Sequence, residues 1–175
     1  MIRKILLGLL AVYVLAGCGF IWKEGGPPVG ERGQPPRIVD FHAEEVIRPG
    51  ETWKVYLKLR DVDCDMTYVV TQVWQSGAGS YPSSFTPIRE IACPELVGYI
   101  FLRTSSDRSL VWNQYDVNVF VRDRQGHQSN AIKLPINFDW VSSKEAPDRW
   151  QSVTVVSIGA ISIDLLNTFK SDTGR

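Results

Sequence analysis

The side chains that could carry acid–base, nucleophilic or metal chemistry are few and far apart in this sequence. It contains two histidines, His42 and His127, and three cysteines among 175 residues. None of them stands in a zinc-protease motif, a serine-hydrolase elbow or a cysteine–histidine spacing that is typical of a nucleophilic site. The sequence therefore predicts that this protein is not an enzyme.

Three aspartates, Asp61, Asp63 and Asp65, alternate along one short segment. Carboxylates gathered at a loop are the ligands that Ca²⁺ takes. A twelve-residue calcium loop starting at Asp61 would place Met66 where glycine is required and Gln72 where the last acidic ligand belongs, so that motif is excluded. Two interpretations stay open: a looser calcium site between strands, and a solvated turn.

The N-terminal residues have the anatomy of an export signal. Arg3 and Lys4 precede an uncharged apolar run over residues 5–16. A spanning helix needs about 20 apolar residues, so this run is shorter than a membrane span. The Leu-Ala-Gly-Cys sequence that ends at Cys18 resembles the lipobox of bacterial lipoproteins. This resemblance implies a signal peptide over 1–17 and a diacylated Cys18.

The lipobox resemblance also implies a location. Gly19 follows Cys18 where inner-membrane lipoproteins carry aspartate, which implies an outer-membrane protein that faces the periplasm. Because each buried methylene contributes about 0.8 kcal/mol, two or three acyl chains anchor a protein stably. An uncleaved anchor helix with an incidental cysteine is the alternative, and it too attaches the chain to a membrane.

Cys64 and Cys93 are the cysteines that remain if Cys18 carries lipid. An even number of cysteines in an exported chain predicts a disulfide. The bond would close a loop of about 30 residues and stabilise the fold by roughly 3 to 4 kcal/mol in the chain-entropy model. Two separate buried thiols are the alternative.

Composition and charge describe one neutral globular domain with tails. Hydrophobic residues make up 44% and charged residues 22% of the chain. The 19 basic and 19 acidic side chains give a formal net charge of zero. No electrostatic field attracts a polyanion, so nucleic-acid partners are excluded. Apart from the lipid on Cys18, no cofactor is predicted.

The chain divides into a linker, a domain and a C-terminal segment. Residues 18–36 are rich in glycine and proline and predict a flexible tether. From residue 37 onward, apolar residues alternate with polar ones between turn residues, which predicts β-strands. The expected main strands cover 37–42, 53–59, 66–74, 96–103, 115–122 and 131–138.

Two features of this region carry a likeness to a fold family. The strand over 115–122 followed by the Asp123–Gly126 turn is similar to the F–G hairpin of bacterial immunoglobulin-like and fibronectin-III-like domains. The Pro49-Gly50-Glu51 turn before an alternating strand resembles their A–B region. The resemblance covers about 37–139 and implies an all-β, immunoglobulin-like antiparallel β-sandwich with a binding or spacing role.

Residues 140–175 form a connector and an unexpected apolar segment, in which Asp164 is the only charge between Trp150 and Phe169. As a strand, the segment would alternate β-branched residues with serine and threonine. As a helix, which we favour, it presents one apolar stripe. That stripe consists of Val155, Ile158, Ile161, Leu165 and Phe169. Such a stripe either packs on its own sandwich or docks into a partner.

Aromatic residues supply the other candidate contacts. We expect Trp53, Trp74 and Tyr115 in the core, and Tyr81 and Phe85 exposed in the Ser/Gly/Pro-rich segment 76–87. The sequence predicts a membrane-anchored, non-catalytic structural or protein-binding subunit of a cell-envelope assembly. The alternative is a stand-alone module that binds glycan or peptidoglycan through exposed loop aromatics.

Overall fold

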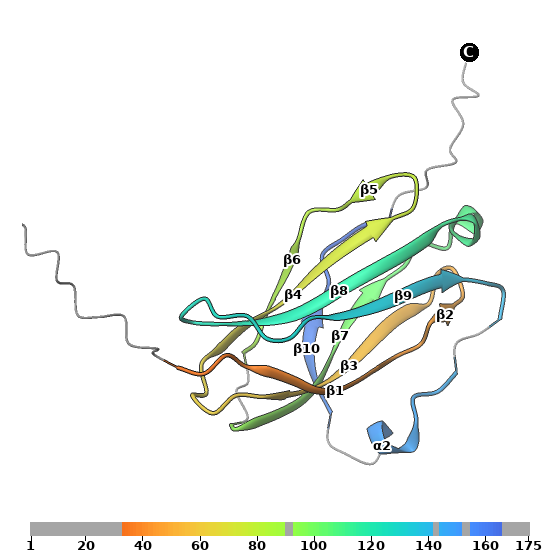
Figure 1. Cartoon of the computed structure of the whole chain (residues 1–175). Coiled ribbons are helices and arrows are strands. Elements are labelled where there is room, and N and C mark those ends of the chain that lie inside the picture. The colour runs from red at the N-terminus through yellow and green to blue at the C-terminus, as the bar shows by residue number, and fades with distance from the viewer. Residues whose placement is uncertain (1–32, 90–92, 142–143, 152–154, 166–175) are drawn as a thin grey trace, which may run out of the picture. The chain divides into compact units, whose positions relative to one another are not determined.

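The computed structural model describes residues 33–89, 93–141, 144–151 and 155–165 (Figure 1). The predicted signal peptide, Cys18 and most of the tether lie outside the described residues. None of the helices in the described part is long and apolar enough to cross a membrane. Its elements are β1 (Arg37–Ala43), β2 (Val46–Ile47), β3 (Thr52–Arg60), β4 (Met66–Gln75), β5 (Gly79–Ser80), β6 (Ser84–Pro87), β7 (Glu95–Arg103), the 3₁₀ helix η2 (Arg108–Trp112), β8 (Gln114–Asp123), β9 (Ile132–Phe138), α2 (Asp148–Gln151) and β10 (Val156–Ala160).

The strands form two sheets that pack face to face (Figure 1). A four-stranded sheet has the order β1-β3-β7-β10, and a six-stranded sheet has the order β2-β9-β8-β4-β5, with β6 also paired to β4. The pairs β1–β3, β3–β7, β4–β8 and β8–β9 are antiparallel. This is the A-B-E sheet facing the C-F-G sheet of an immunoglobulin-like sandwich, and it confirms the predicted fold class.

Strict alternation in two central strands builds the core between the sheets. In β3, Trp53 is 1% exposed and Val55 and Leu57 are fully buried, while every second side chain faces outward. In β8, Tyr115 and Val117 point inward in the same way. Side chains separated by two residues share one face of a strand, so one face of each strand fills the interior.

The C-terminal segment contradicts the predicted helix. Residues Val156–Ala160 form β10, which pairs in parallel with β7, and the nearby helix α2 is only four residues long. The helix prediction is wrong here because a tertiary contact decides the conformation. A Cβ added to Gly98 on β7 would lie 2.7 Å from Cγ1 of Ile158, so the missing side chain leaves the space that Ile158 occupies.

Side-chain hydrogen bonds join β10 to the six-stranded sheet as well. The Thr86 hydroxyl on β6 donates to the Ala160 carbonyl oxygen at 3.0 Å. The Ser162 amide donates to the Ser84 hydroxyl at 2.9 Å. The C-terminal segment therefore bridges the edges of both sheets, and the sandwich continues beyond residue 139.

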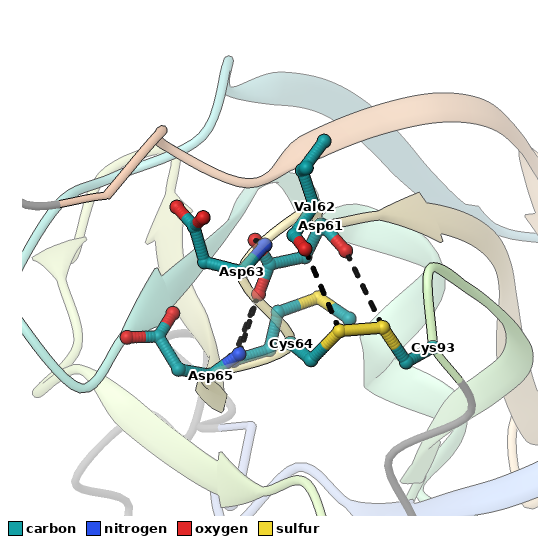
Figure 2. The surroundings of a disulfide bond; sticks show 7 residues. Asp61, Val62, Asp63, Cys64, Asp65 and Cys93 are labelled. Carbon is teal, nitrogen blue, oxygen red and sulfur yellow. Dashed lines mark hydrogen bonds between the residues drawn. A yellow bond between two sulfur atoms is a disulfide. The ribbon is translucent and has the colours of Figure 1, made fainter.

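The predicted disulfide is confirmed. Cys64 and Cys93 are bonded, with their Cα atoms 5.5 Å apart (Figure 2). Cys64 follows β3 and Cys93 precedes β7, so the bond joins the loops at one end of two neighbouring strands. It also ties the aspartate segment into the fold.

Candidate functional site: an exposed aromatic surface

The aspartate segment is organised around the Asp61 carboxylate. The Asp61 side chain is buried, and its carboxylate accepts the amide protons of Asp65 at 2.8 Å and Met66 at 3.1 Å (Figure 2). A third amide, that of Asp63, donates to the other carboxylate oxygen at 3.3 Å. Asp61 thus caps its own turn with local hydrogen bonds.

The other two aspartates point away from Asp61 (Figure 2). Asp63 accepts the amide proton of Gln34, and Asp65 accepts a side-chain proton of Gln125 at 3.3 Å. The structure does not bring the three carboxylates together. Within the described ranges, no group of three His, Cys, Asp or Glu side chains is placed to hold a metal ion.

The two histidines serve separate local contacts. His42 on β1 lies 3.2 Å from Glu44, measured from Nε2 to Oε1. His127, beside the β8–β9 turn, places Nδ1 2.7 Å from Oδ2 of the buried Asp123. Asp123 also accepts the amide protons of Gln125 and His127, so this pair stabilises the turn.

Tyr81 is half-buried, which corrects its predicted exposure. It packs against the core, and its hydroxyl donates to the side-chain oxygen of Gln75. Gln75 is fully buried and donates to Asn113 at 2.8 Å. Burial, and to a lesser extent the neighbouring Tyr81, raises the pKa of Tyr115 far above its ordinary value. Tyr115 therefore stays neutral within this polar end of the core.

The predicted C-terminal stripe packs mainly on its own sandwich. Ile161 is 4% exposed in the core, and Ile158 and Leu165 are half-buried against it. The Ile161 amide also donates to the Phe101 carbonyl oxygen at 2.8 Å. Val155 is half-buried, and Phe169 lies outside the described residues. The described residues of the stripe therefore pack against the chain's own sandwich.

The outer face of the six-stranded sheet, in contrast, carries several exposed rings. Tyr68, Trp74 and Phe85 keep 42%, 43% and 51% of their surface exposed. We call the group of Tyr68, Val70, Trp74, Phe85 and Phe120 the aromatic surface. Trp74 was expected in the core, but alternation along β4 places it on the same outward face as Tyr68.

Strand register holds this group together. Val70 on β4 is the direct partner of Phe85 on β6 and of Phe120 on β8. Tyr68 contacts Phe85 edge to face, with ring centroids 6.1 Å apart. Val70 is only 1% exposed, although it stands on the outer face and does not belong to the core cluster. The flanking rings therefore form a continuous apolar layer above it.

A polar rim surrounds the aromatic surface. Lys133 forms a 3.0 Å ion pair with Asp116, which is the strand partner of Trp74. At the opposite end, a shallow cavity of about 340 Å³ lies between Tyr68, Phe85 and a group of polar residues. These polar residues include Arg122, Arg124 and Gln125. An apolar centre with a charged rim is the composition of protein–protein interfaces.

The sequence does contain a signal for this surface. In the run from Met66 to Trp74, the residues Tyr68, Val70 and Trp74 share one parity and therefore one face. Consecutive apolar residues at Val69 and Val70 concealed the alternation. Phe85 was correctly expected to be exposed, although it lies on strand β6 and not in an irregular loop.

Comparison with known proteins gives two distant structural matches. No family model matches the chain, and no curated protein matches it. A solved structure of the CARDB domain of the PF1109 protein from Pyrococcus furiosus, in complex with di-metal ions, has a TM-score of 0.34 and 9% identity, covering 61% of this chain and 94% of that one. The PKD domain of an M14-like peptidase from Thermoplasmatales archaeon SCGC AB-540-F20 has a TM-score of 0.35 and 14% identity, covering 61% and 98%. The strand order observed here places the chain among immunoglobulin-like β-sandwich proteins.

Proposed function

We propose that this protein is a non-catalytic binding module of the cell envelope that docks another protein through the aromatic surface. The exposed rings on one sheet face carry this proposal: Tyr68 contacts Phe85, and Trp74 stands on the same face further along β4. Clustered exposed aromatic residues with a polar rim are the usual anchors of protein interfaces.

The geometry favours tight docking because the anchors stand on paired strands. Tyr68 and Trp74 belong to β4, which is hydrogen-bonded on both sides, and Phe85 belongs to β6. Side chains on a preformed sheet lose less conformational freedom on binding than side chains on a loop. Truncating such an anchor typically costs about 2 kcal/mol of binding free energy or more.

The anchoring part of the proposal is supported by the sequence. The Leu-Ala-Gly-Cys motif supports acylation of Cys18 and retention at the outer membrane, with the sandwich on the periplasmic side. The glycine- and proline-rich tether over 19–36 would hold the domain roughly 20 to 25 Å from the lipid if it is coil-like. A partner protein of the envelope is within reach at that distance.

The glycan or peptidoglycan alternative is less well supported. It rests on exposed loop aromatics such as Tyr81, and the Tyr81 ring packs against the core while its hydroxyl donates to Gln75. Binding of peptidoglycan fragments that is lost in Tyr81→Ala and kept in Phe85→Ser would favour the alternative.

The test is gentle detergent extraction of the acylated protein, followed by sizing and mass spectrometry of the complex. The double variant Tyr68→Ser/Phe85→Ser should lose the complex. Trp112→Ser should keep it, because Trp112 is 74% exposed on η2 and lies outside the aromatic surface. A complex that survives the double variant, or a wild-type protein that is always a lone monomer, would overturn the proposal.

A further inference from the structure

A second candidate site lies at the other sheet, in a cavity of about 430 Å³. The end of β1, the start of β3 and the connector after β9 surround it. This volume falls in the range of sites that hold a small molecule, about 300 to 1,000 Å³. The residues used below are His42, Glu44, Lys54, Lys144 and Glu145, and all of them line the cavity.

The lining carries charges of both signs. Glu44 and Glu145 supply carboxylates, and Lys54 and Lys144 supply ammonium groups. His42 lies 3.2 Å from Glu44, and the Lys54 ammonium lies 5.3 Å from the centre of the Tyr99 ring. The His42 contact orients the Glu44 carboxylate, and the Lys54 ammonium lies beside Tyr99 on the outer face of the same sheet.

The segments that surround the cavity are held in place by contacts that do not involve its charged side chains. The Trp53 indole donates to the Glu44 carbonyl oxygen at 2.7 Å, which holds the end of β1 against β3. The connector is held by Trp150, whose ring centroid lies 5.7 Å from that of Tyr56. An ion pair of 3.5 Å between Arg149 and Asp40 adds a second attachment.

The lining discriminates between classes of ligand. A simple anion would be attracted by the two lysines and repelled by the two glutamates, and a simple cation the reverse, so the lining favours neither. An apolar ligand would desolvate four charged groups without replacing their hydrogen bonds. A sugar ring stacks on an exposed aromatic face, but Trp53 is 1% exposed and Tyr56 is covered by Trp150.

We propose that this cavity binds a small zwitterion, of the class of a free amino acid or short peptide. The ligand carboxylate lies toward Lys54 and Lys144, and its ammonium group lies toward Glu44 and Glu145. Binding of this kind is separate from docking at the aromatic surface, which stands on the opposite sheet. Either proposal can fail without the other.

The test is calorimetric titration of the full-length protein in detergent with L-alanyl-L-alanine. Two half-blocked probes, N-acetyl-alanyl-alanine and alanyl-alanine amide, each lack one charge. Both should bind about tenfold more weakly than the zwitterion, since a charge-assisted hydrogen bond is lost in each case. A half-blocked probe that binds as tightly as the zwitterion would overturn the proposal, as would a wild-type protein with no binding at 10 mM, roughly the limit for a weak small ligand.

Matched variants locate the binding. Lys54→Gln and Glu44→Gln should each weaken dipeptide binding about tenfold, and Lys54→Arg should restore most of it. Lys133→Gln removes an exposed lysine from the other sheet and should leave binding unchanged. Circular dichroism of each variant separates lost binding from lost folding. Equal binding by the Lys54→Gln and Lys133→Gln variants, with both folded, would place the ligand elsewhere and refute the assignment.

Discussion

The two outer faces of the sandwich both carry aromatic rings, but their surroundings differ. On the four-stranded sheet, Trp150 packs against Tyr56 with tilted rings, and the Lys54 ammonium lies over Tyr99. On the six-stranded sheet, Tyr68, Trp74 and Phe85 remain between 42% and 51% exposed. The comparison shows that aromatic content does not mark a binding face; what marks it is whether the chain's own segments cover the rings.

The cover on the four-stranded sheet comes from the connector between β9 and β10. Trp150 of α2 is 5% exposed, and the neighbouring Arg149 pairs with Asp40 on β1. This connector can return along the sheet because β10 then pairs with β7. The C-terminal segment therefore stabilises one face directly, and leaves the described part of the other face open to a partner.

The largest expected effect on stability comes from removing the covering ring. Trp150→Ala should lower the free energy of unfolding by about 3 kcal/mol, because a buried indole is replaced by a cavity above Tyr56. Urea denaturation measures the change. Trp112→Ala, at 74% exposure, is the control and should change stability by less than about 0.5 kcal/mol. If the two variants changed the free energy of unfolding equally, the packing of Trp150 on Tyr56 would not stabilise the fold.

The next prediction tests whether β10 is held in place by the space beside Gly98 on β7 that Ile158 fills. Gly98→Val should destabilise the protein by about 2 kcal/mol, because its side chain would collide with Ile158. Amide hydrogen exchange at Ile161, which donates to Phe101, should accelerate more than exchange in β8. Unchanged protection at Ile161 would show that the segment is held by other contacts.

Replacing a ring of the aromatic surface should affect partner binding much more than stability. Phe85→Ser should change the free energy of unfolding by less than about 1 kcal/mol, since about half of the side chain is already in water. Co-purification of a partner should nevertheless be lost. A large loss of stability with the partner retained would assign Phe85 to folding and not to binding.

The smallest expected effect distinguishes the apolar packing of the Trp150 ring from the contribution of its indole N–H group. The Trp150 indole nitrogen is buried, and no hydrogen-bond partner is found for it in the described structure. Trp150→Phe loses some apolar contact but also removes this buried donor, whose desolvation costs about 1 to 3 kcal/mol. The net change in stability should stay below about 1 kcal/mol by urea denaturation. A loss as large as that of Trp150→Ala would point to an unrecognised acceptor.

Local patterns were sufficient for the regular part of the fold. The alternation around Trp53 and Tyr115 predicts the inward faces of β3 and β8, and the structure buries both residues. Parity of the cysteines predicts the Cys64–Cys93 bond, which is present. These predictions succeed because period-two alternation and an even number of cysteines each act through one dominant physical effect.

The sequence by itself determined the alternating strands of the sandwich, and it predicts an export signal with a lipobox-like Cys18 and a glycine- and proline-rich tether. Only the tertiary structure decided that the C-terminal apolar segment is a strand, because its conformation depends on the space above Gly98, which lies far away in the chain. It also decided which rings stay exposed. Trp53 faces the opposite sheet while Trp74 stands on the outer side of its own, so the burial of these two tryptophans follows from the packing of layers and not from hydrophobicity.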